Sequence, residues 1–160
     1  MTPDDAREDL YDRSALWAIG ELRARDVVDA ACAALVAGLD TPALRVLAAC
    51  TYGEADTDVE GLLPPVMAEL GLDLPELDTR ESEEAGLRAL ARQLLNAELT
   101  PRELARTVHR RFGHRLELAE PLSCLDYEYD ALEYGTRTRE QLDAEARAEA
   151  LRLGRGRHAQ

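Results

Sequence analysis

The feature that most limits how this chain can fold is the recurrence of leucine, alanine and valine at intervals of three and four residues. This spacing places apolar side chains on one face of a helix. Because aromatic residues make up only 4% of the chain, these aliphatic side chains must also build the core, which favours packed helices over strands. The clearest apolar stripe consists of Leu87, Leu90, Ala91, Leu94 and Leu95.

Capping signals locate several helix ends. Thr100-Pro101-Arg102-Glu103 combines an N-cap residue, proline at the first helical position and glutamate at the third, and predicts a helix that ends at Phe112, before Gly113. An apolar period over 59–70 is interrupted by Gly61 and by Pro64-Pro65, which predicts a kinked helix or two short helices that end at Gly71. Comparable signals predict helices over 25–38, from Thr41 to Ala48, from Thr79 or Ser82 onward, and over 138–153.

The fold class that follows is all-α, with six or seven short packed helices. A chain of 160 residues can bury a continuous core without disulfides or metals, so we expect a single domain over residues 1–153 and a frayed tail over 154–160. The segment from His114 to Gly135 is ambiguous, because leucines and glutamates alternate over its first part. We leave open one short strand or extended loop near 114–135.

Cysteine usage and the start of the chain indicate the compartment. Cys32, Cys50 and Cys124 are odd in number and widely spaced, so they predict buried thiols and neither a disulfide framework nor a metal cluster. The sequence has no secretion-signal pattern and no apolar run of membrane-spanning length. We therefore expect a cytoplasmic protein without membrane attachment. All 19 basic residues are arginine, which is typical of a high-GC bacterial genome.

The net charge of −13 is unevenly distributed. Residues 54–84 hold eleven carboxylates and one arginine, whereas residues 85–115 hold seven arginines and two glutamates. Residues 116–135 then hold six carboxylates and no arginine. The overall charge argues against a primary role in binding nucleic acid, whose phosphates it would repel.

The densest group of unusual residues, called here the acidic tyrosine cluster, joins carboxylates to three of the five tyrosines. Its first carboxylates have the spacing of a calcium loop, but Ala131 and Arg137 stand where such a loop needs glycine and glutamate, so no calcium site is expected. An extended backbone would present the three carboxylates on one side, whereas a helix would spread them around its axis. Two interpretations stay open: the cluster is a solvated acidic face, or it is a surface that binds another protein. The cluster consists of Asp126, Tyr127, Glu128, Tyr129, Asp130, Glu133 and Tyr134.

A second candidate surface is an arginine stripe formed by Arg102, Arg106 and Arg110, four residues apart on one predicted helix. It would bind an anion such as phosphate or nucleic acid. The alternative is that carboxylates of the same chain pair with these guanidinium groups. Such ion pairs contribute little to stability on an exposed surface.

No catalytic or cofactor motif is found. His109 and His114 are five residues apart across Gly113, so we expect no shared metal site, and no serine lies in a nucleophile motif. We expect no cofactor, no metal and no enzymatic activity. Trp17, the single tryptophan, is interpreted as a core anchor.

The stretch from Leu35 to Ala48, with Leu16-Trp17 and the later Glu69-Leu70-Gly71-Leu72, resembles small helical proteins of high-GC bacteria, some of them encoded beside secreted toxins. The resemblance covers about the first 100 residues and carries no catalytic signature. The segmented acidic charge, the acidic tyrosine cluster and the absence of a catalytic motif favour an immunity or antitoxin-like protein that neutralises a basic protein partner through the acidic tyrosine cluster. The alternative is a regulatory adaptor that binds nucleic acid or a phosphorylated ligand through the arginine stripe.

Overall fold

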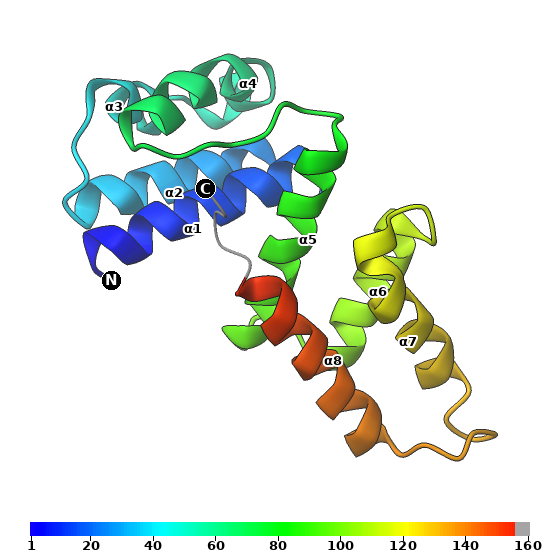
Figure 1. Ribbon diagram of the computed structural model, residues 1–160. Coiled ribbons are helices and arrows are strands. Elements are labelled where there is room, and N and C mark those ends of the chain that lie inside the picture. Colours follow the sequence, from blue (N-terminus) through cyan, green and yellow to red (C-terminus); the bar gives the residue numbers. More distant parts are fainter. Residues whose placement is uncertain (156–160) are drawn as a thin grey trace. The chain divides into compact units, whose positions relative to one another are not determined.

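The computed structural model describes residues 1–155, which form eight α-helices, one 3₁₀ helix and, within that range, no strand (Figure 1). The predicted all-α class is confirmed. Two helices, α1 (Pro3–Ala18) and α7 (Glu120–Asp130), have no counterpart among the helices that the sequence predicts. The others are α2 (Ala24–Val36), α3 (Pro42–Ala48), α4 (Tyr52–Glu69), α5 (Arg80–Leu95), α6 (Pro101–Phe112), η1 (Glu117–Ala119) and α8 (Arg139–Gly154).

The chain divides into two compact units, a first unit of residues 1–86 and a second unit that begins at Leu87. The division falls inside α5, and not in the 72–78 loop that follows α4. The expected frayed tail begins too early, because Gly154 still belongs to α8 and Arg155 is its C-cap. Residues 156–160 of that tail lie outside the described residues.

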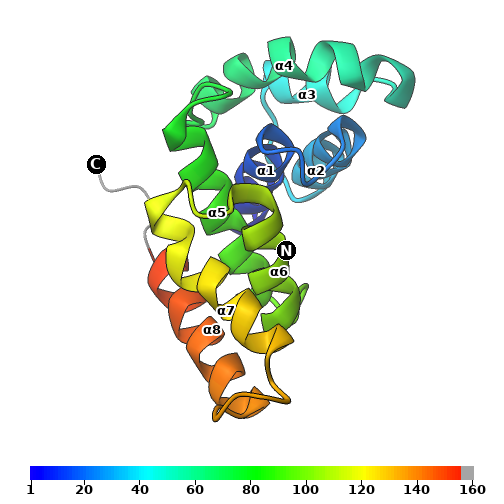
Figure 2. The same ribbon diagram turned by 90° about the vertical axis from the view of Figure 1, so that its right-hand side faces the viewer.

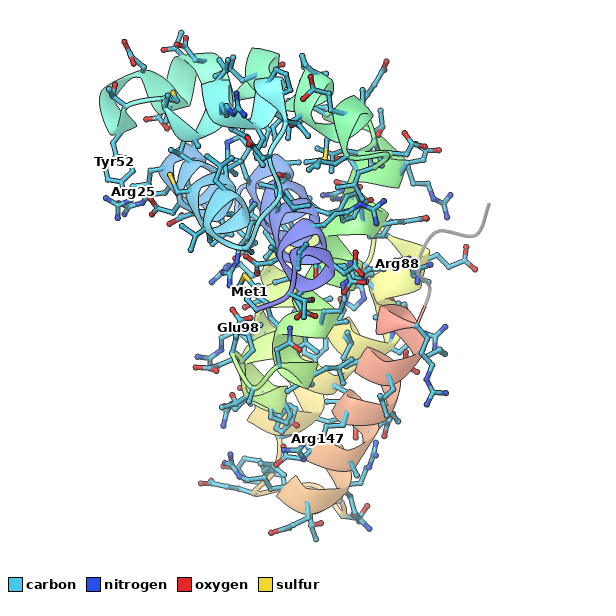
Figure 3. The ribbon with its side chains drawn as sticks, turned by 90° about the vertical axis from the view of Figure 1, so that its left-hand side faces the viewer. Met1, Arg25, Tyr52, Arg88, Glu98 and Arg147 are labelled. Atoms are coloured by element: carbon cyan, nitrogen blue, oxygen red, sulfur yellow. The ribbon has the colours of Figure 1, made fainter. Side chains whose placement is uncertain are left out.

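The first unit is built around α2, which packs against α1, α3 and α4 (Figure 1). Its centre holds fully buried aliphatic side chains such as Val27, Leu44 and Val59. The predicted turn signals operate here: Gly38 adopts a positive φ of 100° after α2, and the Thr41 side chain accepts a hydrogen bond from the amide of Leu44 at the start of α3. Tyr52, labelled in Figure 3, donates from its hydroxyl to Asp29 at 2.6 Å and so links α4 to α2.

Helix α4 is continuous through Pro64 and Pro65, so the alternative of two short helices is wrong. Each proline lacks the amide that would bond the carbonyl four residues earlier. Those carbonyls belong to Glu60 and Gly61, which are exposed, as both prolines are. Because water can reach these carbonyls, the missing hydrogen bonds leave no buried polar group unsatisfied.

The segment after α4 returns along α1. Gly71 ends α4 with a φ of 64°, and Arg7 of α1 donates from Nε to the carbonyl of Leu70 at 2.8 Å and from Nη2 to that of Gly71 at 3.2 Å. The Tyr11 hydroxyl donates to the carbonyl of Asp73 at 3.4 Å. These bonds hold the loop of residues 72–78 within the first unit.

In the second unit α6, α7 and α8 pack against one another (Figure 2). The capping box of α6 is present as predicted, since Thr100 and Glu103 exchange hydrogen bonds with each other's backbone amides. The expectation of an extended segment near 114–135 is wrong for its central part, which forms η1 and α7. Leu122, Leu125 and Tyr129 are spaced as on one face of a helix and are buried. Burial of this face favours a helix over the extended structure that the alternating leucines and glutamates suggest.

Candidate functional site

Three rings of the second unit form a group, called here the histidine cluster, that the sequence analysis does not anticipate. The ring centroids of His109 and His114 lie 5.4 Å apart, and the Tyr127 ring lies 4.7 Å from that of His109 and 5.8 Å from that of His114. His109 is in the last turn of α6, where Gly113 reverses the chain with a φ of 56° and returns His114 toward it. The five-residue spacing therefore does not keep the two rings apart, whereas the expectation that they share no metal site stays a prediction.

Each histidine of the cluster contacts a carboxylate of α7. Nδ1 of His109 lies 2.8 Å from Oδ2 of Asp126, and both side chains are largely buried, with exposed fractions of 24% and 14%. Nδ1 of His114 lies 2.9 Å from Oε2 of Glu120, and its Nε2 lies 3.4 Å from the Tyr127 hydroxyl. The cluster thus joins the end of α6 to one face of α7.

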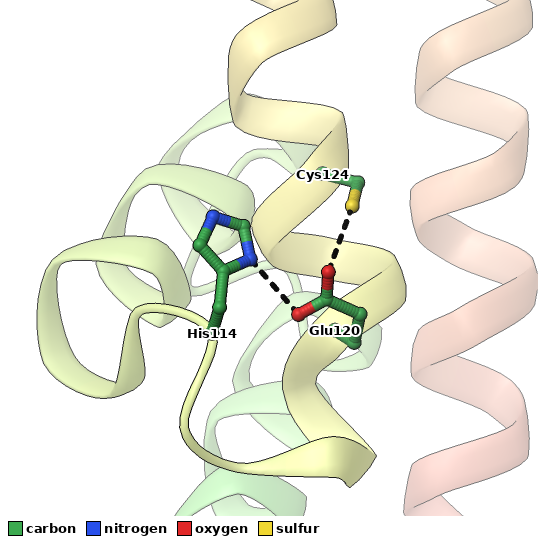
Figure 4. A group of neighbouring side chains, drawn as sticks. All are labelled: His114, Glu120 and Cys124. Carbon is green, nitrogen blue, oxygen red and sulfur yellow. Dashed lines mark hydrogen bonds and ion pairs between the residues drawn. The ribbon is translucent and has the colours of Figure 1, made fainter.

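Glu120 also accepts a hydrogen bond from a thiol. Sγ of Cys124, one helical turn later on α7, lies 3.3 Å from Oε1 of Glu120 (Figure 4). The hydrogen bonds from His114 and then from Cys124 hold the pKa of Glu120 below its usual value. The same carboxylate raises the pKa of the Cys124 thiol, with a smaller contribution from burial, so the sulfur is a protonated, weak nucleophile at neutral pH.

The predicted burial of the cysteines is wrong for all three. Cys32 and Cys124 are exposed and Cys50 is half-buried. The apolar neighbours of Cys32 and Cys124 in sequence suggest burial, but on α2 and α7 those neighbours lie on other helix faces, whereas Cys50 lies between α3 and α4.

The carboxylates of the acidic tyrosine cluster do not form one face, because residues 126–130 are the last turns of α7. Three of them have partners within the second unit. Asp126 contacts His109, Glu128 accepts from Arg137 at 2.8 Å, and Asp130 accepts from Arg102 at 3.0 Å.

The tyrosines of this cluster also differ from one another. Tyr129 is buried and donates to Asp143 of α8 at 2.6 Å, and burial followed by this bond raises its pKa. It therefore packs in the unit and does not contribute to an exposed surface. Tyr127 is 55% exposed, and Tyr134 is 89% exposed next to the exposed Glu133.

Two arginines of the arginine stripe line a hollow of the second unit, and the binding of an anion by the stripe stays a prediction. A hollow of about 390 Å³ between α6 and α8 is lined by Arg102, Arg106, Arg139 and Arg147, and Arg147 is labelled in Figure 3. Arg110 is not among the lining residues. The stripe therefore contributes two of its three arginines, and α8 adds two that sequence spacing on α6 alone does not reveal.

The first unit contains a groove of about 680 Å³, called here the acid-rimmed groove, formed by α1, α4 and the loop of residues 72–78. None of the residues that line it, all within the described range, is basic. Its carboxylates are Glu60, Asp73, Glu76 and Asp78. Its larger apolar side chains are Trp17, Leu63, Met67, Leu72, Leu74 and Leu77.

The groove is not evident from local sequence patterns, because it is assembled from three separate segments. Trp17 is half-buried and lines the groove, in addition to packing on the core as expected. The available signal was the 72–78 loop itself, where leucine and acidic residues alternate. Leucines are unusual in a loop with no apolar surface to contact.

Comparison of the chain with protein-family models, curated proteins and solved structures finds no match to any of them. The resemblance to small helical proteins of high-GC bacteria therefore stays a prediction. None of the helices in the described range has the length and apolar character needed to cross a bilayer.

Proposed function

We propose that this chain is a non-enzymatic protein-binding protein of the immunity or antitoxin kind, which neutralises a basic protein by occluding it. The observation that carries the proposal is the acid-rimmed groove, in which an apolar floor is bordered by four carboxylates. The cytoplasm is the proposed compartment, since thiols that form no disulfide are typical of a reducing environment.

The charge of the first unit supports a basic partner. Its 86 residues hold 20 carboxylates and six arginines, a net charge of −14. A surface of this sign accelerates encounters with a positively charged protein and repels acidic ones. The attraction acts before contact, and it weakens as salt screens the charges.

The occupant that best fits the groove is a basic amphipathic segment of the partner. Its apolar side chains would pack on residues such as Leu63, Met67 and Leu74, and its lysine or arginine side chains would reach Glu60, Asp73 or Glu76. Recognition of one amphipathic face in an apolar groove is a common mode of peptide binding. In the acidic tyrosine cluster, which the sequence analysis favours as the contact surface, Glu133 and Tyr134 are exposed and able to make an additional contact.

Trp17 provides a direct test, because it is the only tryptophan of the chain and lines the groove. The probe is a synthetic peptide of leucine and lysine in an amphipathic helical pattern, without aromatic residues. Its binding should change the Trp17 emission spectrum, and the dissociation constant should rise with salt. A peptide with glutamate in place of every lysine should leave the emission unchanged.

Matched charge variants separate groove binding from general attraction. Glu60→Gln, Asp73→Asn and Glu76→Gln together should weaken binding about tenfold, since three exposed pairs at about 0.5 kcal/mol each sum to about one decade of affinity. The control combines Asp56→Asn, Asp58→Asn and Glu81→Gln, which removes equal charge outside the groove. Equal weakening by both sets, or an unresponsive Trp17, would contradict the proposal.

The immunity interpretation has its own test in cells. A basic, toxic protein encoded beside this chain should be neutralised by co-expression of the wild type and not by the groove variant. Protection that is unaffected by the groove substitutions would assign the neutralising contact to another surface.

A second candidate function is binding of a phosphorylated ligand in the arginine-lined hollow. Four guanidinium groups line it, of which that of Arg102 also contacts Asp130, and its two carboxylates are engaged, Glu103 with Thr100 and Asp143 with Tyr129. Arginine pairs bind phosphate through parallel hydrogen bonds.

Arg106→Gln with Arg147→Gln should abolish binding of a phosphoserine peptide, as measured by fluorescence anisotropy of the labelled peptide. The control Arg25→Gln with Arg155→Gln should leave that binding intact. Equal binding of the unphosphorylated peptide would remove this candidate.

A further inference from the structure

Three metal-ligating side chains of different chemistry meet at the start of α7. The donor atoms of His114, Glu120 and Cys124 all lie within 4.8 Å of one another (Figure 4). Nδ1 of His114 lies 2.9 Å from one carboxylate oxygen of Glu120, and Sγ of Cys124 lies 3.3 Å from the other. Nitrogen, oxygen and sulfur donors are thus presented toward a common region at the surface of the second unit.

The distances suit a small tetrahedral ion. Zinc bonds of about 2.0 Å to nitrogen or oxygen and about 2.3 Å to sulfur place neighbouring donors roughly 3.3–3.5 Å apart. The separations from the two carboxylate oxygens are 3.3 Å for the thiol, which lies in this range, and 2.9 Å for the imidazole, which would lengthen on binding of an ion. Because His114 and Cys124 are exposed, small rotations of their side chains can adjust the remaining distance.

The backbone holds the three residues in register. Glu120 and Cys124 are four residues apart on α7 and therefore share one face of that helix. The buried Ser123 donates from Oγ to the carbonyl of Gly113 at 2.7 Å, which ties the residue before His114 to the same helix. The site is thus formed by one helix and a turn fixed to it.

Tyr127 orients the imidazole. Its ring lies nearly parallel to that of His114, with an angle of 3° between the planes, and its hydroxyl lies 3.4 Å from Nε2. With Nδ1 directed at the ion, Nε2–H would donate to this hydroxyl. Such outer contacts fix the tautomer of a metal-bound histidine.

We propose that His114, Glu120 and Cys124 form a three-ligand site for a borderline divalent cation, best matched by Zn²⁺, with a fourth position occupied by water. The mixed donor set is typical of zinc and related first-row ions and is unlike the all-oxygen sites of calcium and magnesium. On binding, the Cys124 S–H bond breaks, the proton passes to the buffer and a sulfur–metal bond forms. No electron transfer accompanies the step.

Cobalt(II) is the probe for the test, because cobalt–thiolate bonds give a charge-transfer absorption in the near ultraviolet. The reduced, full-length protein titrated with Co²⁺ should show this band, and stoichiometric Zn²⁺ should remove it. Cys124→Ser should abolish the band, and His114→Ala and Glu120→Gln should each weaken Zn²⁺ binding by at least about tenfold. Tyr127→Phe should weaken it by about tenfold while the cobalt band remains.

The chain offers a matched control, since Cys50, Glu54 and Asp58 form a second group of neighbouring donors, on the first unit. In that group Glu54 is already bound to the amide and hydroxyl of Thr51. Cys50→Ser and Cys32→Ser should therefore leave the cobalt band intact. Absence of the band in the wild type, or its loss in Cys50→Ser, would overturn the proposal, with far-ultraviolet circular dichroism confirming that every variant is folded.

Discussion

The two units of the molecule use charge in opposite ways. The first unit carries a net charge of −14, whereas residues 87–160 hold 12 carboxylates and 13 arginines, a net charge of +1. The net negative charge of the protein therefore comes entirely from the first unit. Carboxylates and arginines are present in nearly equal numbers in the second unit, which allows them to be paired with one another.

The ion pairs follow the same division. In the second unit Arg102 of α6 contacts Asp130 of α7, and Arg137 contacts both Glu128 of α7 and Glu145 of α8. Those described for the first unit are local in sequence, such as Arg13 with Asp9 and Arg45 with Asp40. The comparison teaches that oppositely charged residues pair between helices in the second unit, whereas the first unit has many more carboxylates than arginines.

The strongest test of this division is removal of one buried leucine from each unit. Leu47 and Leu104 are fully buried, so Leu47→Ala and Leu104→Ala should each cost about 2–5 kcal/mol through lost burial and cavity formation. Hydrogen–deuterium exchange should show lost protection mainly in α1–α4 for the first substitution and in α6–α8 for the second.

The controls for this pair are exposed apolar residues. Val46→Ala and Leu151→Ala alter side chains that are 56% and 43% exposed, and each should change stability by less than about 0.5 kcal/mol. If either core substitution lowered protection equally throughout residues 1–155, the chain would be the single cooperative domain that its length predicts.

A smaller effect is expected from the buried tyrosine of the second unit. Tyr129→Phe removes a hydrogen bond to a carboxylate and should cost about 1.5–3 kcal/mol in chemical denaturation, whereas Tyr134→Phe should have no effect. Because burial and Asp143 raise the pKa of Tyr129 above its usual 10.0, this contribution is complete below pH 10. It is lost as the pH rises through the higher folded value.

The difference between wild type and Tyr129→Phe should therefore narrow in alkaline solution. A difference in unfolding free energy that stays constant up to strongly alkaline pH would mean that the fold does not selectively stabilise the protonated Tyr129 hydroxyl.

The helices that the sequence predicts are those whose signals are local. Thr100, Thr138 and Thr41 act as N-caps where expected, because a cap depends on only three or four neighbouring residues. Helix α1 lacks a clear apolar stripe because its buried face includes Ala6 and Ser14, although Thr2 and Asp5 form a capping box that a search for such boxes would find. Helix α7 begins without a side-chain cap.

The sites were less accessible from sequence than the helices. The proximity of His114 and Cys124 to the same carboxylate requires α7 to be helical and Gly113 to reverse the chain, and neither follows from spacing alone. The acid-rimmed groove requires the 72–78 loop to return along α1, which depends on Arg7 bonding two carbonyls that lie more than sixty positions later. Contacts between distant segments depend on tertiary packing, which local patterns do not encode.

The smallest effects are expected at the threonine–glutamate pairs that begin one helix in each unit, Thr51 with Glu54 and Thr100 with Glu103. The Thr100 hydroxyl accepts from the amide of Glu103, so Thr100→Ala should cost about 0.5–2 kcal/mol in denaturant titrations. The Thr51 hydroxyl instead donates to the Glu54 carboxylate, and Thr51→Ala should cost less. Hydrogen bonds from Thr51 and Thr100 hold the pKa of Glu54 and of Glu103 below their usual 4.5. The stabilisation that these two carboxylates give is therefore complete above pH 4.5, and it is lost as the pH falls through their lower pKa values in the folded protein.

The rest of each unit should make the response to acid unequal. Protonation of excess carboxylates relieves repulsion in the first unit and offsets part of this loss. In the second unit the charges are balanced, and the lowered pKa of Glu120 adds a further loss of the same sign. Hydrogen exchange followed from pH 7 downward, corrected for the intrinsic rate, should thus show the second unit losing protection first, and an earlier loss in the first unit would mean that its excess charge does not act on its stability.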